Sequence, residues 1–192
     1  MPKKIILMRH GETDFNDQGV MQGSSDTFLN AKGYEQAKDA AQKLKTENIE
    51  ILFSSNLKRA YQTAYAVSEV IKLPIITSPL LQERSFGQLE GRAFTDIRIY
   101  ANRFGEDGNF TGWWNTEFEV ETEEAMMSRL GTFRKKLEEY EEKTVLIVSH
   151  GVIIRYFLKL YDIPQAEIAQ IPFENTATAT LVKQHSTYTL VL

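Results

Sequence analysis

An arginine and a histidine, Arg9 and His10, stand side by side where the apolar run Ile5 to Met8 ends. A strand built from that run would carry both side chains to the carboxyl edge of a sheet, where open α/β folds usually bind ligands. The arginine offers a planar, permanently charged fork that suits phosphate oxygens, and the histidine offers a nitrogen nucleophile that is neutral near pH 7. The pair predicts a phosphate-binding site with a reactive group inside it.

Three further polar groups follow predicted strands in the same way. His150 follows the apolar run 145–148 and precedes Gly151, which is expected to open a helix whose free amides and positive dipole end favour an anion. Arg59 and Glu83 each follow another predicted strand, and Glu83 is the best-placed acid. Because parallel strands end at the same edge of a sheet, we expect all these side chains to lie on one side of it.

The elements that must position these residues alternate along the chain, as short apolar runs and longer helical patterns. This alternation is typical of a layered α/β domain, here a three-layer α/β/α sandwich around a mostly parallel, mixed sheet of about six strands. The predicted strands are Lys4 to Met8, Ile49 to Phe53, Pro74 to Thr77, Thr144 to Val148, Thr178 to Val182 and Thr187 to Val191. The last two are expected to form a hairpin around Gln184 to Ser186, with His185 structural or solvated.

Apolar residues repeat at helical spacing in two long stripes, from Leu57 to Ile71 and from Met126 to Tyr140. Both stripes are expected to face a core, and we assign them no chemistry. Polar side chains that accept hydrogen bonds from the first free amides of a helix are expected to start helices at Asn30, at Ser55 or Asn56, and at Thr122.

The composition limits the class of protein. With 192 residues, of which 42% are hydrophobic, the chain is expected to form a single domain over residues 1–192. The absence of cysteine excludes disulfides, thiolate metal sites and phosphatase mechanisms with a cysteine nucleophile. A net charge of -4 argues against a nucleic-acid partner. The short amino-terminal apolar run and the lack of a membrane-length run predict a cytoplasmic protein with no membrane partner.

Motifs of other enzyme classes are missing from the sequence. It contains no His-x-His or His-Glu-x-x-His pattern and no acidic cluster beside either histidine, so we expect no metal and no cofactor. A Walker A loop, a Gly-x-Ser-x-Gly elbow and a dinucleotide-binding glycine pattern are also missing, which excludes the common nucleotide and serine-hydrolase readings. The helical stripes do not distinguish a monomer from a homodimer.

Five motifs in this order resemble those of the histidine phosphatase superfamily, the phosphoglycerate mutase-like proteins, over nearly the whole chain. They are segments 9–13, 22–23, 54–64, 81–91 and 149–151. The resemblance implies that His10 is phosphorylated during turnover and that Arg9, Arg59 and His150 surround the phosphoryl group. It also implies that Glu83 donates the proton to the leaving group.

The same resemblance implies that Asn16 and Gln22 contact the phosphate or the substrate. We add Gly23, Arg84 and Gly151 to the predicted substrate-binding residues. For Arg84 the alternative is an ion pair with a surface carboxylate.

Phosphoryl transfer needs alignment and positive charge around the phosphoryl oxygens, which two arginines and a histidine supply without a metal. His10 must attack as a neutral imidazole, so its other ring nitrogen should donate to an acceptor, for which we expect a backbone carbonyl. Glu83 must be protonated to assist the leaving group, and a neighbouring phosphate dianion would raise its pKa. Two in-line displacements predict retention of configuration at phosphorus.

The substrate is the open question. The mutases of the family that this chain resembles are longer chains, with an adjacent arginine pair after the glutamate segment. Here the corresponding region, Phe94 to Phe118, has only Arg98 and Arg103, well separated. Segment 85–91 also resembles the phosphatase branch. We therefore predict a metal-independent phosphomonoesterase that acts on small phosphorylated metabolites. The alternatives are a cofactor-dependent phosphoglycerate mutase, an α-ribazole phosphatase as the specific case, and a phospho-ligand binding protein without turnover.

One irregular stretch, residues 105–120, is too long for a simple turn. Loops of this length are commonly lids or binding segments, and we expect one of these roles here. Within it, Trp113 and Trp114 either stack on a bound substrate or clamp the loop to the body of the protein.

Overall fold

A computed structural model describes residues 1–98, 117–141, 143–172 and 174–191, and its centre is one six-stranded sheet in the order β3-β2-β4-β1-β5-β6. The strands are β1 (Lys4–Arg9), β2 (Ile51–Ser55), β3 (Ile75–Ser78), β4 (Thr144–Ser149), β5 (Thr178–Gln184) and β6 (Thr187–Val191). Strands β3, β2, β4 and β1 run parallel, while β5 pairs antiparallel with β1 and with β6. The predicted mixed, mostly parallel sheet is confirmed.

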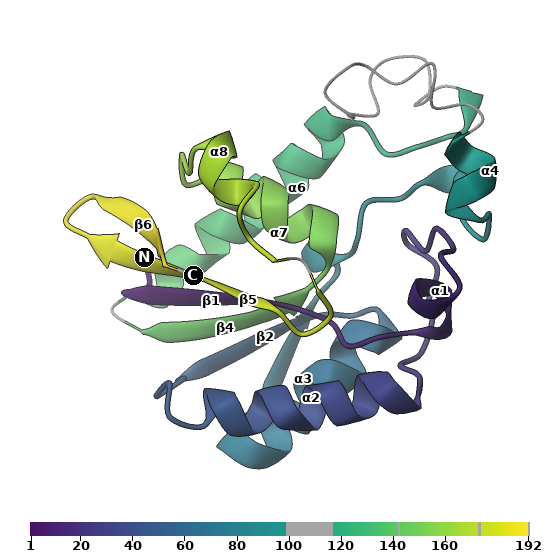
Figure 1. The fold of residues 1–192 in the computed structure, drawn as a ribbon. Coiled ribbons are helices and arrows are strands. Elements are labelled where there is room, and N and C mark those ends of the chain that lie inside the picture. The colour runs from purple at the N-terminus through teal and green to yellow at the C-terminus, as the bar shows by residue number, and fades with distance from the viewer. Residues whose placement is uncertain (99–116, 142, 173, 192) are drawn as a thin grey trace.

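Helices cover both faces of this sheet, as Figure 1 shows. One face carries α2 (Ala31–Leu44) and α3 (Lys58–Ile71), and the other carries α6 (Glu123–Lys136), α7 (Gly151–Lys159) and α8 (Gln165–Ile168). The short helices α1 (Asp14–Asp17) and α4 (Phe94–Arg98) lie at one end of the sheet (Figure 1). Three 3₁₀ turns complete the described elements: η1 (Pro79–Leu81), η2 (Gly87–Leu89) and η4 (Leu137–Glu139).

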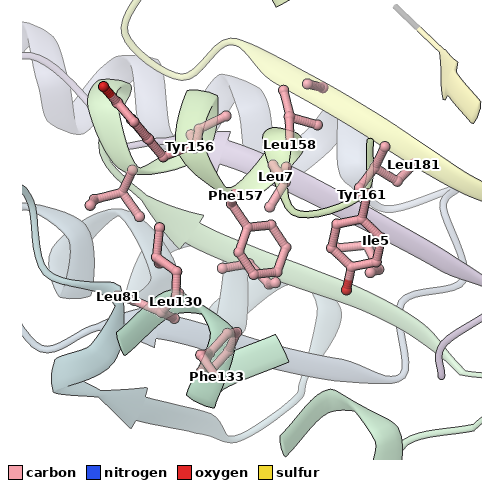
Figure 2. Close-up of a cluster of buried hydrophobic side chains, with 14 of the residues drawn as sticks. Ile5, Leu7, Leu81, Leu130, Phe133, Tyr156, Phe157, Leu158, Tyr161 and Leu181 are labelled. Carbon is pink, nitrogen blue, oxygen red and sulfur yellow. The ribbon is translucent and has the colours of Figure 1, made fainter. Parts of the chain in front are cut away.

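Residues of the central strands alternate between two cores, because successive side chains of a strand point to opposite faces. In β1, Ile5 and Leu7 join the core under α6 and α7, whereas Ile6 and Met8 join the core under α2 and α3. Figure 2 shows the first of these cores, where the ring centre of Phe157 of α7 lies 6.1 Å from that of Phe133 of α6. With both faces covered, the strands read as continuous apolar runs.

Most element boundaries agree with prediction, and the helix starts at Asn30 and Thr122 are confirmed. Asn30 accepts from the amide of Gly33, and Thr122 accepts from that of Ala125. The stripe that ends at Tyr140 divides between α6 and η4, and Tyr140 itself packs against the core.

The start predicted for the third helix is wrong. α3 begins at Lys58 with Leu57 as its N-cap residue, and no side chain of the cap accepts a hydrogen bond. The amide of Lys58 donates instead to Asp26, at 2.7 Å. This long-range acceptor replaces the local cap. The hydroxyl of Ser55 instead accepts from the amide of Leu57 and contacts Nε2 of His150.

The predicted hairpin is confirmed, whereas the predicted lid is not tested. The β5–β6 hairpin has its turn at His185 and Ser186, with His185 in the left-handed region at φ 59°. Residues 105–116, including Trp113 and Trp114, lie outside the described residues, so the predicted lid stays a prediction. None of the described helices is long and apolar enough to span a membrane.

Candidate active site

A cavity of about 460 Å³ opens at the carboxyl edge of the parallel strands. Nine of the ten predicted site residues line it: Arg9, His10, Asn16, Gln22, Gly23, Arg59, Glu83, Arg84 and Gly151. The tenth, His150, is completely buried, and its ring centre lies 5.2 Å from that of His10. The fold therefore brings together residues from four separate strand ends.

His10 follows the last residue of β1, and its ring is held in one tautomer. Its Nδ1 lies 2.7 Å from the carbonyl oxygen of Gly11, which can only accept, so Nδ1 carries the proton. Its Nε2 accepts from the Nε–H of Arg59 at 3.3 Å and is therefore the unprotonated nitrogen of the ring. The expected backbone acceptor for the second ring nitrogen is thus Gly11.

The backbone at Gly11 has no room for a side chain. A Cβ there would lie 2.5 Å from the carbonyl oxygen of Gly33 at the start of α2. The amide of Gly11 also donates to the hydroxyl of Thr63 at 3.0 Å. This close packing fixes the carbonyl that in turn orients the His10 ring.

Burial and neighbouring charge keep His10 neutral. Burial lowers its pKa well below the ordinary value, and the cations of Arg59 and Arg9 lower it further. A neutral ring with a lone pair on Nε2 is the form that attacks phosphorus.

Arg59 lies in the first turn of α3, and its side chain is fully buried. Its two terminal nitrogens donate to the carbonyl oxygens of Ser25 (2.6 Å) and Gly23 (2.7 Å). Burial lowers the pKa of Arg59 to about 10, against the opposing effect of nearby carboxylates such as that of Glu83, so the guanidinium stays charged at pH 7. It is a fixed cation directly beside Nε2 of His10.

His150 caps the amino terminus of α7, and its Nε2 lies 2.9 Å from the hydroxyl of Ser55. That hydroxyl also accepts from the amide of Leu57, at 3.3 Å. Among the described residues, Nδ1 of His150 has no hydrogen-bond partner although it is buried. Burial lowers the pKa of His150 well below the ordinary value, with a further contribution from the cation of Arg59.

Glu83 lies in the segment after η1, with backbone amides on both carboxylate oxygens. The amides of Arg84 and Val152 donate to it at 2.9 Å and 3.3 Å. Burial raises its pKa, although these amides and the cation of Arg59 act in the opposite direction. The first turn of α7, which we expected to favour a phosphate, thus gives its Val152 amide to Glu83.

Asn16 and Gln22 lie in the cavity wall, and hydrogen bonds fix the oxygen of each side-chain amide. The Oδ1 of Asn16 accepts from the amide of Thr13 and from Nδ2 of Asn175, each at 3.2 Å. The Oε1 of Gln22 accepts from the hydroxyls of Thr13 (2.9 Å) and Thr27 (2.7 Å). The amide NH₂ groups are therefore the donors that these two residues can offer to a ligand.

Arg84 is buried, and its Nε donates to the carbonyl oxygen of Glu121 at 2.8 Å. Burial lowers its pKa, while Tyr156 and the carboxylate of Glu121 act to raise it. The carboxylate of Glu121 itself pairs with Arg129. Arg84 is therefore a buried residue of the cavity wall, and its predicted contact with the substrate stays a prediction.

Sequence analysis missed several residues that hold the site. Ser55 and Thr63 are recognisable afterwards, because both lie in the motif around Arg59 and carry hydroxyls in buried segments. Asn175 gave no local signal, since its partners His10 and Asn16 are 165 and 159 residues away. Arg155 and Tyr156 of α7, which also line the cavity, were not singled out.

The cations of this site are all arginines. No group of three or more histidine, aspartate or glutamate side chains that could hold a metal ion occurs among residues 1–98, 117–141, 143–172 and 174–191. Arg9, at the end of β1, keeps its charge although burial lowers its pKa, and the carboxylate of Glu83 partly offsets that effect.

A family model for the histidine phosphatase superfamily (branch 1) matches residues 5–192. The chain belongs to this superfamily. It is 36% identical over 155 residues to the uncharacterized phosphatase PhoE of Bacillus subtilis (strain 168), which covers 80% of this chain and 75% of that protein. It is also 31% identical over 169 residues to the adenosylcobalamin/alpha-ribazole phosphatase of Escherichia coli (strain K12), covering 84% and 80%.

The fold of this histidine phosphatase also agrees with solved structures. A phosphoserine phosphatase mutant from Entamoeba histolytica, in complex with phosphoserine, superposes with a TM-score of 0.82 at 28% identity over 100% of this chain and 96% of that one. The predicted family, fold and enzyme class are therefore confirmed.

Proposed function

We propose that this histidine phosphatase hydrolyses phosphomonoesters of small metabolites through a phosphohistidine at His10, without a metal. The observation that carries the proposal is the state of the His10 ring. Its Nδ1–H is held by Gly11, so Nε2 is the nucleophilic nitrogen, and Nε2 gives up its long 3.3 Å contact with the Nε–H of Arg59 when it attacks. Such a ring is prepared for in-line attack on a phosphoryl group in the cavity.

Positive charge around the cavity supports the transfer step. As Nε2 attacks, negative charge spreads over the equatorial phosphoryl oxygens, and preorganised donors there lower the barrier. Arg9 and Arg59 supply two guanidinium groups. In the proposal, the hydroxyl of Ser55 donates to Nε2 of His150, which leaves the proton on Nδ1 to donate to a phosphoryl oxygen.

Glu83 is the proposed general acid. Burial raises the pKa of this carboxyl, so a larger fraction is protonated near neutral pH than for an exposed glutamate. In the first step the proton passes to the leaving oxygen while the phosphorus–oxygen bond breaks and the Nε2–phosphorus bond forms. In the second step the ionised Glu83 takes a proton from water, which attacks phosphorus and frees His10.

The apolar residues of the cavity lining support a small, partly apolar leaving group. They are Val20, Met21, Phe86, Phe94 and Val152. The relatives act on different esters, as their names state, so we leave the natural substrate open among small phosphorylated metabolites. The similarity to the α-ribazole phosphatase of Escherichia coli supports a ribazole phosphate as one specific alternative substrate.

The test is to trap the intermediate. Purified protein mixed rapidly with p-nitrophenyl phosphate in EDTA should carry acid-labile phosphate on His10, located by mass spectrometry of peptides. Phosphate release without a labelled His10 would refute the proposal. A second assay supplies 3-phosphoglycerate with 2,3-bisphosphoglycerate, because formation of 2-phosphoglycerate would identify the mutase alternative.

A further inference from the structure

One carboxylate outside the predicted catalytic set connects two walls of the cavity. Glu90 follows η2, and its Oε1 accepts from the amide of Ser24 (2.8 Å), the hydroxyl of Ser24 (2.9 Å) and the amide of Phe86 (2.9 Å). Its Oε2 accepts from the hydroxyl of Ser25, at 2.7 Å. Four donors from two distant segments thus meet on one side chain.

The segment that Glu90 holds is the one that holds Arg59. The terminal nitrogens of Arg59 donate to the carbonyl oxygens of Gly23 and Ser25, which flank the amide-bonded residue Ser24. The third donor of the guanidinium, Nε, points to Nε2 of His10 at 3.3 Å. Displacing this segment would therefore rotate the guanidinium away from the reacting nitrogen.

The carboxylate of Glu90 lies very close to the backbone of Gly23. The φ of Gly23 is +53°, in the region that favours glycine, and a Cβ there would lie 2.2 Å from Oε1 of Glu90. Burial acts to raise the pKa of Glu90, but hydrogen bonds from Ser25, Ser24 and Phe86 together lower it. The carboxylate is therefore ionised, and all four of its contacts are charge-assisted.

We propose that Glu90 is a positioning residue, which sets the orientation of Arg59 toward His10 by fixing the loop 23–25 against Phe86. It does not touch the substrate, and it acts through the guanidinium. The inference rests on the proposed function insofar as Arg59 stabilises the transferring phosphoryl group.

The two segments stay joined when the carboxylate is removed. The amide of Met21 donates to the carbonyl of Arg92 (2.9 Å), the amide of Gly91 to that of Met21 (2.8 Å), and the amide of Phe94 to that of Gly19 (2.8 Å). These backbone bonds do not involve the Glu90 side chain. Glu90→Gln is therefore expected to fold, with a local change in the loop.

The experiment is a double-mutant cycle on kcat/KM for p-nitrophenyl phosphate, with Glu90→Gln and Arg59→Lys. A misplacement of about 1 Å in a catalytic contact can cost about a hundredfold, so we expect Glu90→Gln alone to lose about ten- to a hundredfold. In the Arg59→Lys background the same change should cost less than about threefold, because residues that act through one contact are not additive. Equal losses in both backgrounds would overturn the proposal.

Glu50→Gln is the matched control. The carboxylate of Glu50 also accepts from a backbone amide, that of Thr144 at 3.0 Å, and from the ammonium of Lys143 at 2.8 Å. These contacts lie at the start of β4, away from the cavity. The Glu50→Gln variant should have a lower melting temperature but an unchanged kcat/KM. Ser25→Ala removes one of the four contacts on Glu90 and should give a smaller loss in the same direction, which keeps the test decisive if Glu90→Gln fails to fold.

A readout independent of turnover separates this inference from the proposed function. The Nε–H resonance of Arg59 in a ¹⁵N NMR spectrum should shift in Glu90→Gln and stay in place in Glu50→Gln. If the wild-type protein released no phosphate from any ester, the proposed function would fail while this resonance still tested Glu90. An unchanged resonance in Glu90→Gln would refute the positioning role itself.

Discussion

Replacement of Glu83 by glutamine tests the proposed proton transfer most directly. The amide keeps the shape of the carboxyl but cannot give up a proton. Protonation of a poor leaving group by a placed acid contributes about 10²- to 10⁴-fold, which corresponds to about 3 to 5 kcal/mol of barrier. We therefore expect that loss in kcat/KM on an alkyl phosphate and a loss of about tenfold or less on p-nitrophenyl phosphate, whose leaving group is a stable anion.

The structure also gives the cost to stability. The carboxyl of Glu83 accepts two backbone amides, those of Arg84 at 2.9 Å and Val152 at 3.3 Å. Glutamine has one oxygen, so one amide loses its acceptor. Because the Val152 contact is long and therefore weak, we expect the free energy of unfolding to fall by only about 1 kcal/mol. A loss of this size leaves the variant folded for kinetic assays.

The pH profile gives the third part of the test. Because the proposed role of Glu83 is that of an acid, we expect activity to fall as pH rises through its pKa, which burial raises above the ordinary value. The alkaline limb of kcat/KM should disappear in Glu83→Gln, measured on one substrate in both proteins. Equal losses on the two esters, or an alkaline limb that persists in the variant, would refute the role of Glu83 as acid.

Three further outcomes are expected. His10→Ala should lose at least about a thousandfold in rate and show no acid-labile phosphate, since a covalent nucleophile is not easily replaced; full activity would contradict the mechanism. On the acid side, kcat/KM should hold down to a pH well below the ordinary histidine pKa, because burial lowers the pKa of His10 and only the neutral ring attacks. Ser55→Ala should lower kcat about tenfold and perturb the ¹⁵N signals of His150, while signals that do not change would argue against the assigned tautomer.

Local pattern predicted β1 and β4 well because burial on both faces of the sheet gives these strands a continuous apolar run. The predicted strand Ile49 to Phe53 is β2 shifted by two residues at each end, Ile51–Ser55. The other five strands begin within one residue and end within two residues of the predicted bounds. The N-cap of α3 could not be predicted locally, because the acceptor for its first amide, Asp26, lies 32 residues earlier. Contacts between distant segments leave no periodic trace in a sequence.

The residue types and their places at strand ends were determined by the sequence alone. Arg9 and His10 follow one apolar run and His150 follows another, so any parallel pairing of those strands puts the three on one edge. That His10, its neighbouring arginines and Glu83 lie together was therefore predictable, as was the phosphatase class, whereas their catalytic roles stay a proposal.

Only the tertiary structure decided the state in which these groups act. The tautomer of His10 depends on the carbonyl of Gly11 and the Nε–H of Arg59, and its low pKa depends on burial that no local pattern measures. The direction of the Arg59 guanidinium depends in turn on loop 23–25 and on Glu90. Hydrogen-bond geometry and desolvation arise from segments far apart in the chain, and these two quantities turn a set of residues into a site.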